Sequence, residues 1–250
     1  MREVLLYKLT WPEIREYLKE NDIVLFPTGS TEQHGKHIAE DNDAFTALEI
    51  SKRVAEKTGV LVAPVMPFGY SPHHMGFPGT ITLSFDTLVN VYKEVCKSLM
   101  KHGFKKIVIM NGHGGNTNAI AEALRELKEE TGMTVYSLMV FPTSTGFAAE
   151  VVKETIKTGG GHADEMETSV GLYLGQRILF ERAEKGVPPE SLSNFHRKYI
   201  RRVSRAVDFH EITVSGSLGD PTLASKEKGE KLVEAVVDEI TEFIEELKKQ

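Results

Sequence analysis

The fold is decided by the stretch Ile23-Val-Leu-Phe-Pro-Thr-Gly-Ser-Thr-Glu-Gln-His-Gly35. Its first four residues are apolar and partly β-branched, and Pro27 and Gly29 end the run, as is typical of a strand buried on both faces. Two further runs, at residues 60–66 and 106–110, have the same length and character. We therefore expect three parallel central strands.

Helical patterns alternate with these strands, at about residues 44–57, 85–102 and 116–131, and a further strand is expected at 134–140. In the second pattern one face is apolar and Gly103 marks the end; the apolar positions are Leu88, Val91, Val95 and Leu99. The alternation predicts an α/β fold: a single-domain three-layer α/β/α arrangement with a mainly parallel central sheet and right-handed crossovers. Ligands then belong at the carboxyl ends of the strands.

The flanking segments complete this plan. Thr10 and Glu13 read as a capping box for a short helix that ends near Lys19. The last third predicts a helix at about 165–179, a polar stretch at 184–208, a Gly/Pro loop at 215–222 and an amphipathic helix at 226–248. Repeats and low-complexity linkers are lacking, so residues 1–250 are expected to form one domain.

Composition limits the classes of partner. The net charge of −6 over 250 residues argues against nucleic-acid binding and against binding to an anionic membrane. A basic cluster between His196 and Arg205 is a solvated face or subunit contact, or it helps to hold an anionic substrate. The only cysteine is Cys96, which excludes an intramolecular disulfide and a thiolate metal cluster. Without a signal-peptide core or an apolar stretch long enough to span a membrane, the expected location is cytoplasmic.

Three chemistry-bearing motifs stand beside the predicted strands, and the first contains Glu32, His34 and Asp43. Glu32 and His34 are two residues apart, so in an extended segment both side chains point to the same side. A set of Glu, His and Asp suits Zn, Mn or Fe(II). The alternative is that Asp43 only caps a helix and His34 is an ordinary loop residue.

The second motif is Asn111-Gly-His-Gly-Gly-Asn116, directly after the third strand. His113 therefore lies at the expected mouth of the site. Its glycines permit positive φ and a close approach of backbone N–H groups to a substrate oxygen, which makes Gly114, Gly115 and Asn116 candidates for substrate binding. A phosphate-binding loop is a weaker interpretation, because the turn has neither a Walker lysine nor a GxGxxG pattern.

The third motif runs Gly159-Gly-Gly-His-Ala-Asp-Glu-Met-Glu-Thr-Ser169. Acidic residues at a helix start are commonly solvated and stabilised by the helix dipole. The preceding glycines and the apolar continuation after Ser169 instead favour a buried, closely packed turn.

Together these motifs, with Phe77-Pro-Gly-Thr80 and Gly219-Asp-Pro221, resemble those of the creatinine amidohydrolase (creatininase) family over about residues 20–230. The resemblance implies an α/β fold, two divalent metal ions per chain, hydrolysis of a C–N bond in a cyclic or formyl amide, and often a hexamer. It also implies that Glu32, His34, Asp43 and His113 are metal ligands, with Asp43 bridging, and that His162 is the catalytic acid/base. His74 is expected either to support the metal ligands from behind or to contact the substrate.

The chain departs from the family pattern at Gly115, where creatinine-hydrolysing members resemble Asn-Gly-His-x-Glu-Asn and the glutamate is a ligand. A lost anionic ligand has to be replaced to keep affinity and charge balance. Glu165 is the preferred replacement, because it lies one helical turn from His162, and Glu167 then orients it from behind. The reverse assignment, with Glu167 as the ligand, stays open.

The resulting hypothesis is a binuclear metal-dependent hydrolase that acts on a small-molecule amide through a metal-bridging water. His162 would protonate the departing nitrogen, and a serine nucleophile is disfavoured because no GxSxG elbow occurs. Creatinine is a doubtful substrate, since the family's creatinine-opening members use loop tryptophans and the only tryptophan here is Trp11. The alternatives are a formamide deformylase for a ribosylaminopyrimidine phosphate, with Arg197 or Arg201 at the phosphate, and a non-catalytic metal- or nucleotide-binding regulatory protein.

Overall fold

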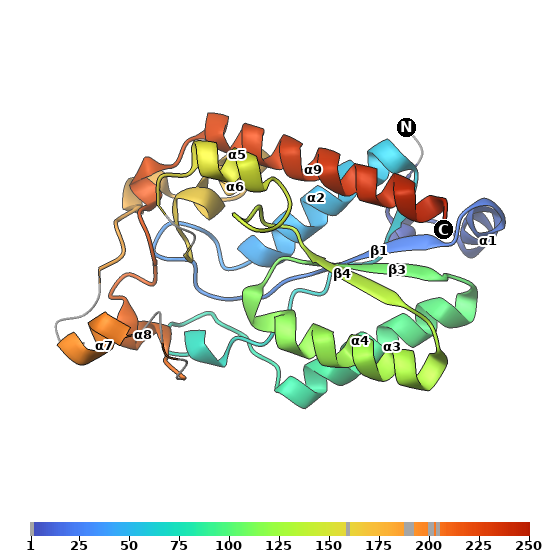
Figure 1. The fold of residues 1–250 in the computed structure, drawn as a ribbon, viewed down its shortest axis with the longest axis horizontal. Coiled ribbons are helices and arrows are strands. Elements are labelled where there is room, and N and C mark those ends of the chain that lie inside the picture. The colour runs from blue at the N-terminus through green and yellow to red at the C-terminus, as the bar shows by residue number, and fades with distance from the viewer. Residues whose placement is uncertain (1–2, 159–160, 188–192, 200–202, 204–205) are drawn as a thin grey trace.

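The central sheet has four strands in the order β2-β1-β3-β4, and every neighbouring pair is parallel. The computed structural model describes residues 3–158, 161–187, 193–199, 203 and 206–250. The strands are β1 (Ile23–Thr28), β2 (Leu61–Val62), β3 (Lys106–Asn111) and β4 (Val135–Met139). The prediction of a three-layer α/β/α fold with a parallel central sheet is confirmed (Figure 1).

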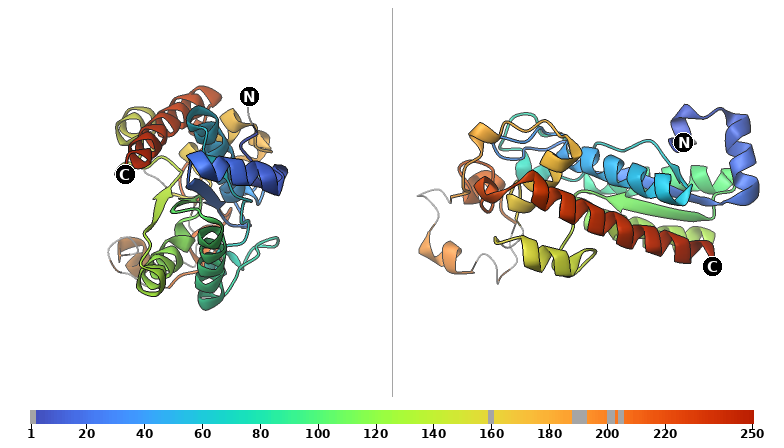
Figure 2. Two further views of the ribbon diagram at one scale, coloured as in Figure 1. Left: turned by 90° about the vertical axis from the view of Figure 1, so that its right-hand side faces the viewer. Right: turned by 90° about the horizontal axis from the view of Figure 1, so that it is seen from above.

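Two helical layers enclose the sheet (Figures 1 and 2). One layer contains α2 (Asn42–Thr58), α6 (Glu165–Leu174) and α9 (Lys226–Lys248), which pack against one another. The other contains α3 (Phe85–His102) and α4 (Thr117–Thr131), which also pack together. The end-on view in Figure 2 separates these two layers from the sheet between them.

The apolar run in β1 is continuous because the strand is buried on both faces. Leu25 belongs to the core cluster under α2 and α9, whereas Val24 and Phe26 belong to the cluster under α3 and α4. Side chains alternate along a strand, so each layer of helices receives every second residue. Because both faces of β1 are anchored in the core, the position of the first motif, which follows β1 directly, is fixed relative to the sheet.

Three details of the predicted elements are corrected. The second strand shortens to Leu61–Val62, because Pro64 has no N–H to donate, although Met66 rejoins β1 through a single bridge to Thr28. Helix α6 ends at Leu174 rather than at residue 179, because Gly175 adopts a left-handed cap with φ of 85°. The buried residues of α3 are Leu88, Val89, Tyr92 and Cys96; of the predicted positions, Leu88 is buried and the other three are only half-buried.

The remaining helices are no longer than α6, and α1 at the N-terminal end is the longest of them. They are α1 (Trp11–Glu20), α5 (Ala149–Thr155), α7 (Asn194–Tyr199), α8 (Phe209–Ile212) and the 3-10 turns Leu6–Lys8, Pro72–His74, Gly114–Asn116, Phe180–Arg182 and Pro221–Leu223. Within the described ranges, no helix combines the length and apolar character needed to cross a membrane.

The strands all point away from α1, which precedes β1, so their carboxyl ends lie at the end of the molecule that carries α7 and α8 (Figure 1). The three motifs meet at this end. The fold thus delivers the polar segments to the place predicted for a parallel sheet.

Candidate metal centre

Asp43 lies at the centre of a buried cluster and faces two histidines, one with each carboxylate oxygen. Its Oδ1 lies 3.0 Å from Nε2 of His34, and its Oδ2 lies 3.0 Å from Nδ1 of His113. Asp43 is the second residue of α2 and is not its cap, which is Asp41. The interpretation of Asp43 as a simple helix cap is therefore excluded.

Two groups of candidate ligands meet at this carboxylate, which belongs to one group and contacts His34 of the other. Glu32 and His113 join Asp43 in one group, while His34, His162 and Glu167 form the other. In each group the ligand atoms lie within 4.8 Å of one another, and all these residues are buried. A carboxylate that presents one oxygen to each group has the position of a bridging ligand between two cations.

The donor set fits a divalent cation. His34 Nδ1 donates to the Glu32 carbonyl oxygen at 3.0 Å, so Nε2 is left to face Asp43 and Glu167. Neither His34 Nε2 nor Asp43 Oδ2 makes a well-oriented hydrogen bond within the described part of the chain, although both are buried. Buried polar atoms of this kind call for a partner, and a metal ion coordinated by imidazole and carboxylate provides one.

The charges in the cluster are strongly coupled. Burial alone would lower the pKa of His34, but the charge of Asp43 and the hydrogen bond to it outweigh burial and raise that pKa to about 10. Burial, with the charges of Asp164 and Asp43, raises the pKa of Glu167 to about 8 despite the opposing effect of His34. Acids and bases held in such mutual contact are typical of functional sites.

Glu167, and not Glu165, is the third carboxylate at the cluster. Its Oε2 lies 3.7 Å from His34 Nε2 and accepts a hydrogen bond from the backbone N–H of Ala163 at 2.6 Å. Ala163 has a left-handed φ of 47°, an uncommon conformation for alanine that turns this N–H toward the carboxylate. This geometry favours the reverse assignment, with Glu167 rather than Glu165 as the candidate ligand.

Glu165 points away from the cluster into a network of its own. It is fully buried, pairs with Lys228 of α9, and accepts hydrogen bonds from the backbone N–H groups of Lys157 and Thr158 at 2.9 and 3.0 Å. Successive side chains on a helix point about 100° apart, so side chains two residues apart lie on nearly opposite faces. Residues 165 and 167 therefore cannot both face the site. Spacing along the sequence alone did not reveal which of them turns inward.

The glycines of the second motif act through close packing. A Cβ on Gly112 would lie 2.2 Å from the backbone oxygen of Asp43, and a Cβ on Gly115 would lie 2.3 Å from His113 Nε2 and 2.4 Å from the Tyr70 oxygen. Neither glycine has positive φ, so the positive φ expected for the glycines of this motif is wrong. Their lack of a side chain lets β3, α2 and the Tyr70 loop approach one another.

The other second-motif residues divide between the pocket and its supports. Gly114 and Gly115 line the pocket, and their contact with a substrate stays a prediction. Asn116 instead lies behind it, where it donates to the Gly29 oxygen and accepts from the Tyr70 N–H, each at 3.0 Å. Asn116 therefore ties two loops together and does not face a substrate.

A cavity of about 600 Å³ opens beside the cluster. Its polar wall includes Glu32, Asp43, His113, His162 and Glu167. The rest of its lining comes mainly from β4, the β4–α5 connection, α5, α6 and α8, and its apolar residues include Met139, Phe141, Val152, Ile156, Met166 and Phe209. A mainly apolar pocket with a few convergent polar groups is the usual form of a small-molecule site.

Three residues at the site were not singled out from the sequence. Ser71 Oγ donates to Glu32 Oε2 at 2.5 Å, and the Gln33 side chain lies 2.9 Å from His74 Nδ1. The Phe209 ring packs on the imidazoles of His74 and His162, with centroids 3.9 and 4.8 Å away. Gln33 lies inside the first motif and Ser71 precedes a His-His pair, so the sequence pointed to both. Nothing in the sequence pointed to Phe209, which directly follows the polar stretch at 184–208.

A model of the family "Creatininase: Creatinine amidohydrolase" matches residues 7–244. The chain belongs to the creatinine amidohydrolase family. Creatinine amidohydrolase of Pseudomonas putida is 30% identical over 98% of this chain and 97% of its own. 3-Dehydro-scyllo-inosose hydrolase of Thermotoga maritima is 28% identical over 96% of this chain and 82% of its own. The prediction of a family hydrolase acting on C–N bonds is therefore confirmed at this level of detail.

Solved structures of creatinine amidohydrolase family proteins have the same fold. A crystal structure of creatinine amidohydrolase covers the whole of both chains with a TM-score of 0.86 and 27% identity. Other similar structures are described as a creatininase variant of Zn–Zn type and as creatininase with Mn. A more distant relative, a 2-amino-5-formylamino-6-ribosylaminopyrimidin-4(3H)-one 5'-monophosphate deformylase of Methanococcus maripaludis, is 29% identical over 54% of this chain and 62% of its own. The buried Asp, Glu and His cluster of the present chain agrees with the use of a divalent metal, as in the Zn and Mn structures of creatininase.

Proposed function

We propose that this protein is a binuclear metal-dependent hydrolase that cleaves a C–N bond of a small cyclic amide or formamide. The observation that carries the proposal is the placement of Asp43 between two buried ligand groups at the mouth of one pocket. Such a shared carboxylate is the arrangement that two neighbouring cations require.

The ligand assignment follows from the two groups. Glu32, Asp43 and His113 would hold one ion. His34 and Glu167, with the Asp43 oxygen that faces His34, would hold the second, while His162, the third member of that group, is left for proton transfer. When bound, such ions supply a water whose pKa lies near 7 and a Lewis acid for a carbonyl group. Three carboxylates and one hydroxide would balance the charge of two divalent ions, so Glu167 would make up for the acidic residue that is missing at Gly115.

His162 is the candidate for proton transfer. It is buried beside the cluster and lines the pocket. Burial, and the nearby His34 and His74, lower its pKa well below the usual value, so the ring is neutral near pH 7. A neutral imidazole accepts a proton and then returns it to a departing nitrogen.

The pocket favours a compact, uncharged or weakly polar substrate. Its outer wall is apolar, and Phe209 keeps water from one face of His74 and His162. Trp11 lies on α1 at the far end of the molecule and is exposed, so it does not surround a ring at the site (Figure 1). Creatinine is therefore expected to be a poor substrate, even though a relative carries that name.

A deformylase acting on a ribosylaminopyrimidine phosphate is the second candidate, because one relative has that activity in its name. Among the described residues that line the pocket, Lys153 is the only lysine or arginine, and it already pairs with Glu150 at 2.6 Å. The phosphate ligands expected from the sequence fall elsewhere: Arg201 and the side chain of Arg197 lie outside the described residues, as does most of the basic cluster.

The decisive experiment combines metal analysis with a substrate panel. Purified protein loaded with Zn, Mn or Fe(II) would be tested on formamides, lactams and cyclic ureas, with the ribosylaminopyrimidine phosphate included. Metal bound at about two ions per chain with turnover of one class supports the proposal. Bound metal without turnover on any member would favour a non-catalytic regulatory protein. A homo-oligomer, with a hexamer as one form, and a cytoplasmic location stay predictions.

A further inference from the structure

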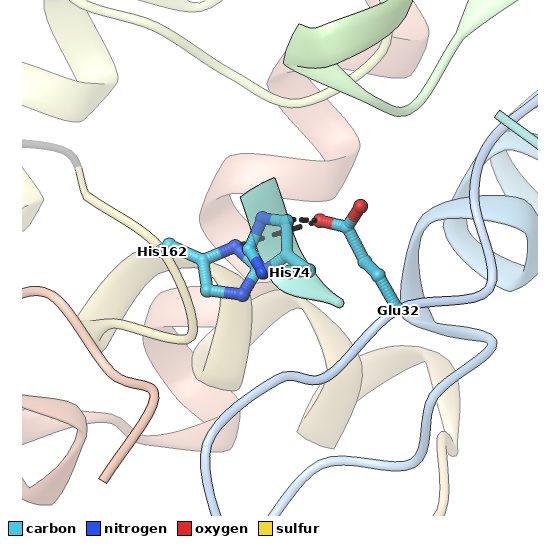
Figure 3. A group of neighbouring side chains, drawn as sticks. All are labelled: Glu32, His74 and His162. Carbon is cyan, nitrogen blue, oxygen red and sulfur yellow. Dashed lines mark ion pairs between the residues drawn. The ribbon is translucent and has the colours of Figure 1, made fainter. Parts of the chain in front are cut away.

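A third group of potential ligands has one residue in common with each of the two groups that meet at Asp43. It consists of Glu32, His74 and His162, drawn in Figure 3. Glu32 Oε1 lies 3.3 Å from His74 Nε2 and 3.8 Å from His162 Nδ1. The group either binds a further cation or presents hydrogen-bonding groups to a substrate, and the positions of the imidazole hydrogens distinguish the two.

Gln33, which lies behind both histidines, determines where those hydrogens are. Its side chain is almost fully buried. The backbone N–H of Gly35 donates to Oε1 at 3.0 Å, and Nε2 donates to the Gly216 oxygen at 3.2 Å. A flipped amide would face a donor with a donor and an acceptor with an acceptor, so the two backbone groups fix its orientation.

Gly216 makes this contact possible. Its φ is +90°, and a Cβ there would lie 2.0 Å from Gln33 Oε1. The backbone at residue 216 therefore approaches the amide as closely as it does only because it carries no side chain. The orientation of Gln33 is built into two separate segments of the chain.

The tautomer of His74 follows from this orientation. Gln33 Nε2 is a donor and lies 2.9 Å from His74 Nδ1, so Nδ1 accepts and carries no hydrogen. The neutral ring then holds its hydrogen on Nε2, which faces Glu32 Oε1. His74 presents a donor to the site.

His162 has the opposite polarity toward the site. Its Nε2 lies 2.6 Å from the backbone oxygen of Gln33, which can only accept, so the hydrogen of the neutral ring is on Nε2. Nδ1 is therefore the lone-pair atom on the side of Glu32. His162 presents an acceptor, and the same residue, Gln33, fixes both rings.

We propose that Gln33 is a positioning residue that holds His74 as a hydrogen-bond donor and His162 as a hydrogen-bond acceptor for one substrate amide. A third cation does not fit, because a metal needs a lone pair on His74 Nε2, where the hydrogen lies. An amide offers the matching pair: a carbonyl oxygen for the His74 N–H, and at the nitrogen a proton for His162 Nδ1. The catalytic meaning of this pair rests on the proposed function, but the two tautomers do not.

The test is ¹⁵N NMR of metal-free and zinc-loaded protein labelled at histidine nitrogens, with signals assigned through His74→Asn and His162→Asn. The expected result is a hydrogen on Nε2 in both rings, kept by His74 when zinc is bound. A hydrogen on Nδ1 of either ring, or loss of the hydrogen from His74 Nε2 when zinc is bound, would overturn the proposal. This measurement needs no variant of Gln33 and no turnover.

Gln33→Glu provides the test of positioning at pH 9, where the introduced carboxylate is ionised. It cannot donate to His74 Nδ1, so we expect His74 to gain a hydrogen there while His162 keeps its tautomer, because its partner is a backbone oxygen. With an active substrate, kcat should fall roughly 10- to 100-fold at unchanged metal content. An unchanged His74 signal would contradict the role of Gln33, whereas a silent amide panel would reject the proposed function alone.

Discussion

His34 Nε2 lies 3.0 Å from Asp43 Oδ1, with both side chains buried and with His34 Nδ1 committed to the Glu32 carbonyl oxygen. An imidazole nitrogen so close to a carboxylate needs a positive charge between the two, and a proton or a metal ion meets that need. The remaining neighbour of this nitrogen, Glu167, makes the same demand from the other side.

Asp43→Asn should release metal from both ligand groups, because it removes the only charge that they share. We expect metal content to drop by at least one ion per chain and hydrolysis to be lost, with circular dichroism unchanged, since Asp43 contributes little to the apolar core. His34→Ala should act in the same direction. Asp41→Asn is the matched control, because Asp41 is exposed and accepts from Gln176. Full metal occupancy in Asp43→Asn would remove the basis for the ligand assignment.

Glu165→Gln and Glu167→Gln should separate stability from metal binding. Glu165→Gln leaves Lys228 without its buried partner, so the free energy of unfolding should fall by about 2 to 3 kcal/mol while metal content stays the same. Glu167→Gln should instead lower the metal content. Chemical denaturation and metal analysis on both variants decide the matter, and metal loss confined to Glu165→Gln would restore the original preference for that residue.

Glu167→Gln should also stabilise the metal-free protein, with an effect that depends on pH. Burial and neighbouring acids raise the pKa of Glu167 from 4.5 to about 8 in the folded chain. Below pH 4.5 the carboxyl is protonated in both states and does not lower the free energy of unfolding. As the pH rises from 4.5 to 8, the unfolded chain loses this proton more readily than the folded chain, so the free energy of unfolding falls. The variant should gain up to about 5 kcal/mol over the wild type at pH 8 and little at pH 4.5. Equal stability of the two proteins at both pH values would show that the surroundings of Glu167 do not raise its pKa.

Gly115→Glu should not turn this protein into an efficient creatininase. The new Cβ would lie 2.3 Å from His113 Nε2 and 2.4 Å from the Tyr70 oxygen, so His113 or the loop has to move. Strain of this kind typically costs about 1 to 3 kcal/mol, and a displaced His113 should also weaken metal binding. Gly114→Ala is the control, since nothing lies within 4 Å of a Cβ at that position. Thermal unfolding and metal titration compare the two.

Creatinine should be hydrolysed at most slowly, because the pocket receives no tryptophan from the chain. The check is a comparison of kcat/KM for creatinine with that for the best formamide or lactam. A higher value for creatinine would show that the apolar wall around Phe141 and Phe209 replaces the missing rings.

The sequence was sufficient for the layers of the fold because hydrophobic periodicity is local. The continuous apolar run of β1 and the apolar periodicity of α3 as a whole are set by residues two to four apart, although the buried stripe of α3 is rotated from the predicted one. The length of β2 was not predictable in the same way, because it depends on Pro64 and on bonds with β1 and the N-terminal segment. Helix α6 was predicted too long, since Gly175 was treated as an interior residue.

The site was predictable where motif residues adjoin a strand end, as for Glu32, His34 and His113. Choosing between Glu165 and Glu167 required the rotation of α6, which is set by its packing on α9 and by the Glu165 pair with Lys228. Phe209 was out of reach for another reason: it meets the histidines only through tertiary contact, more than a hundred residues away from His74.

The close packing at Gly112 has a consequence for how the pocket can diversify. The approach of β3 to the backbone of Asp43 is set by main-chain contact, so the acidic and imidazole groups are held by parts of the chain that tolerate little substitution. The facing wall is different, because Met139, Phe141 and Val152 project from segments that contribute none of the proposed ligands. Side chains there can be exchanged without disturbing the reactive centre. A scaffold divided in this way lets new substrates be acquired by altering one wall, in keeping with relatives named for an inosose, a creatinine and a formylaminopyrimidine.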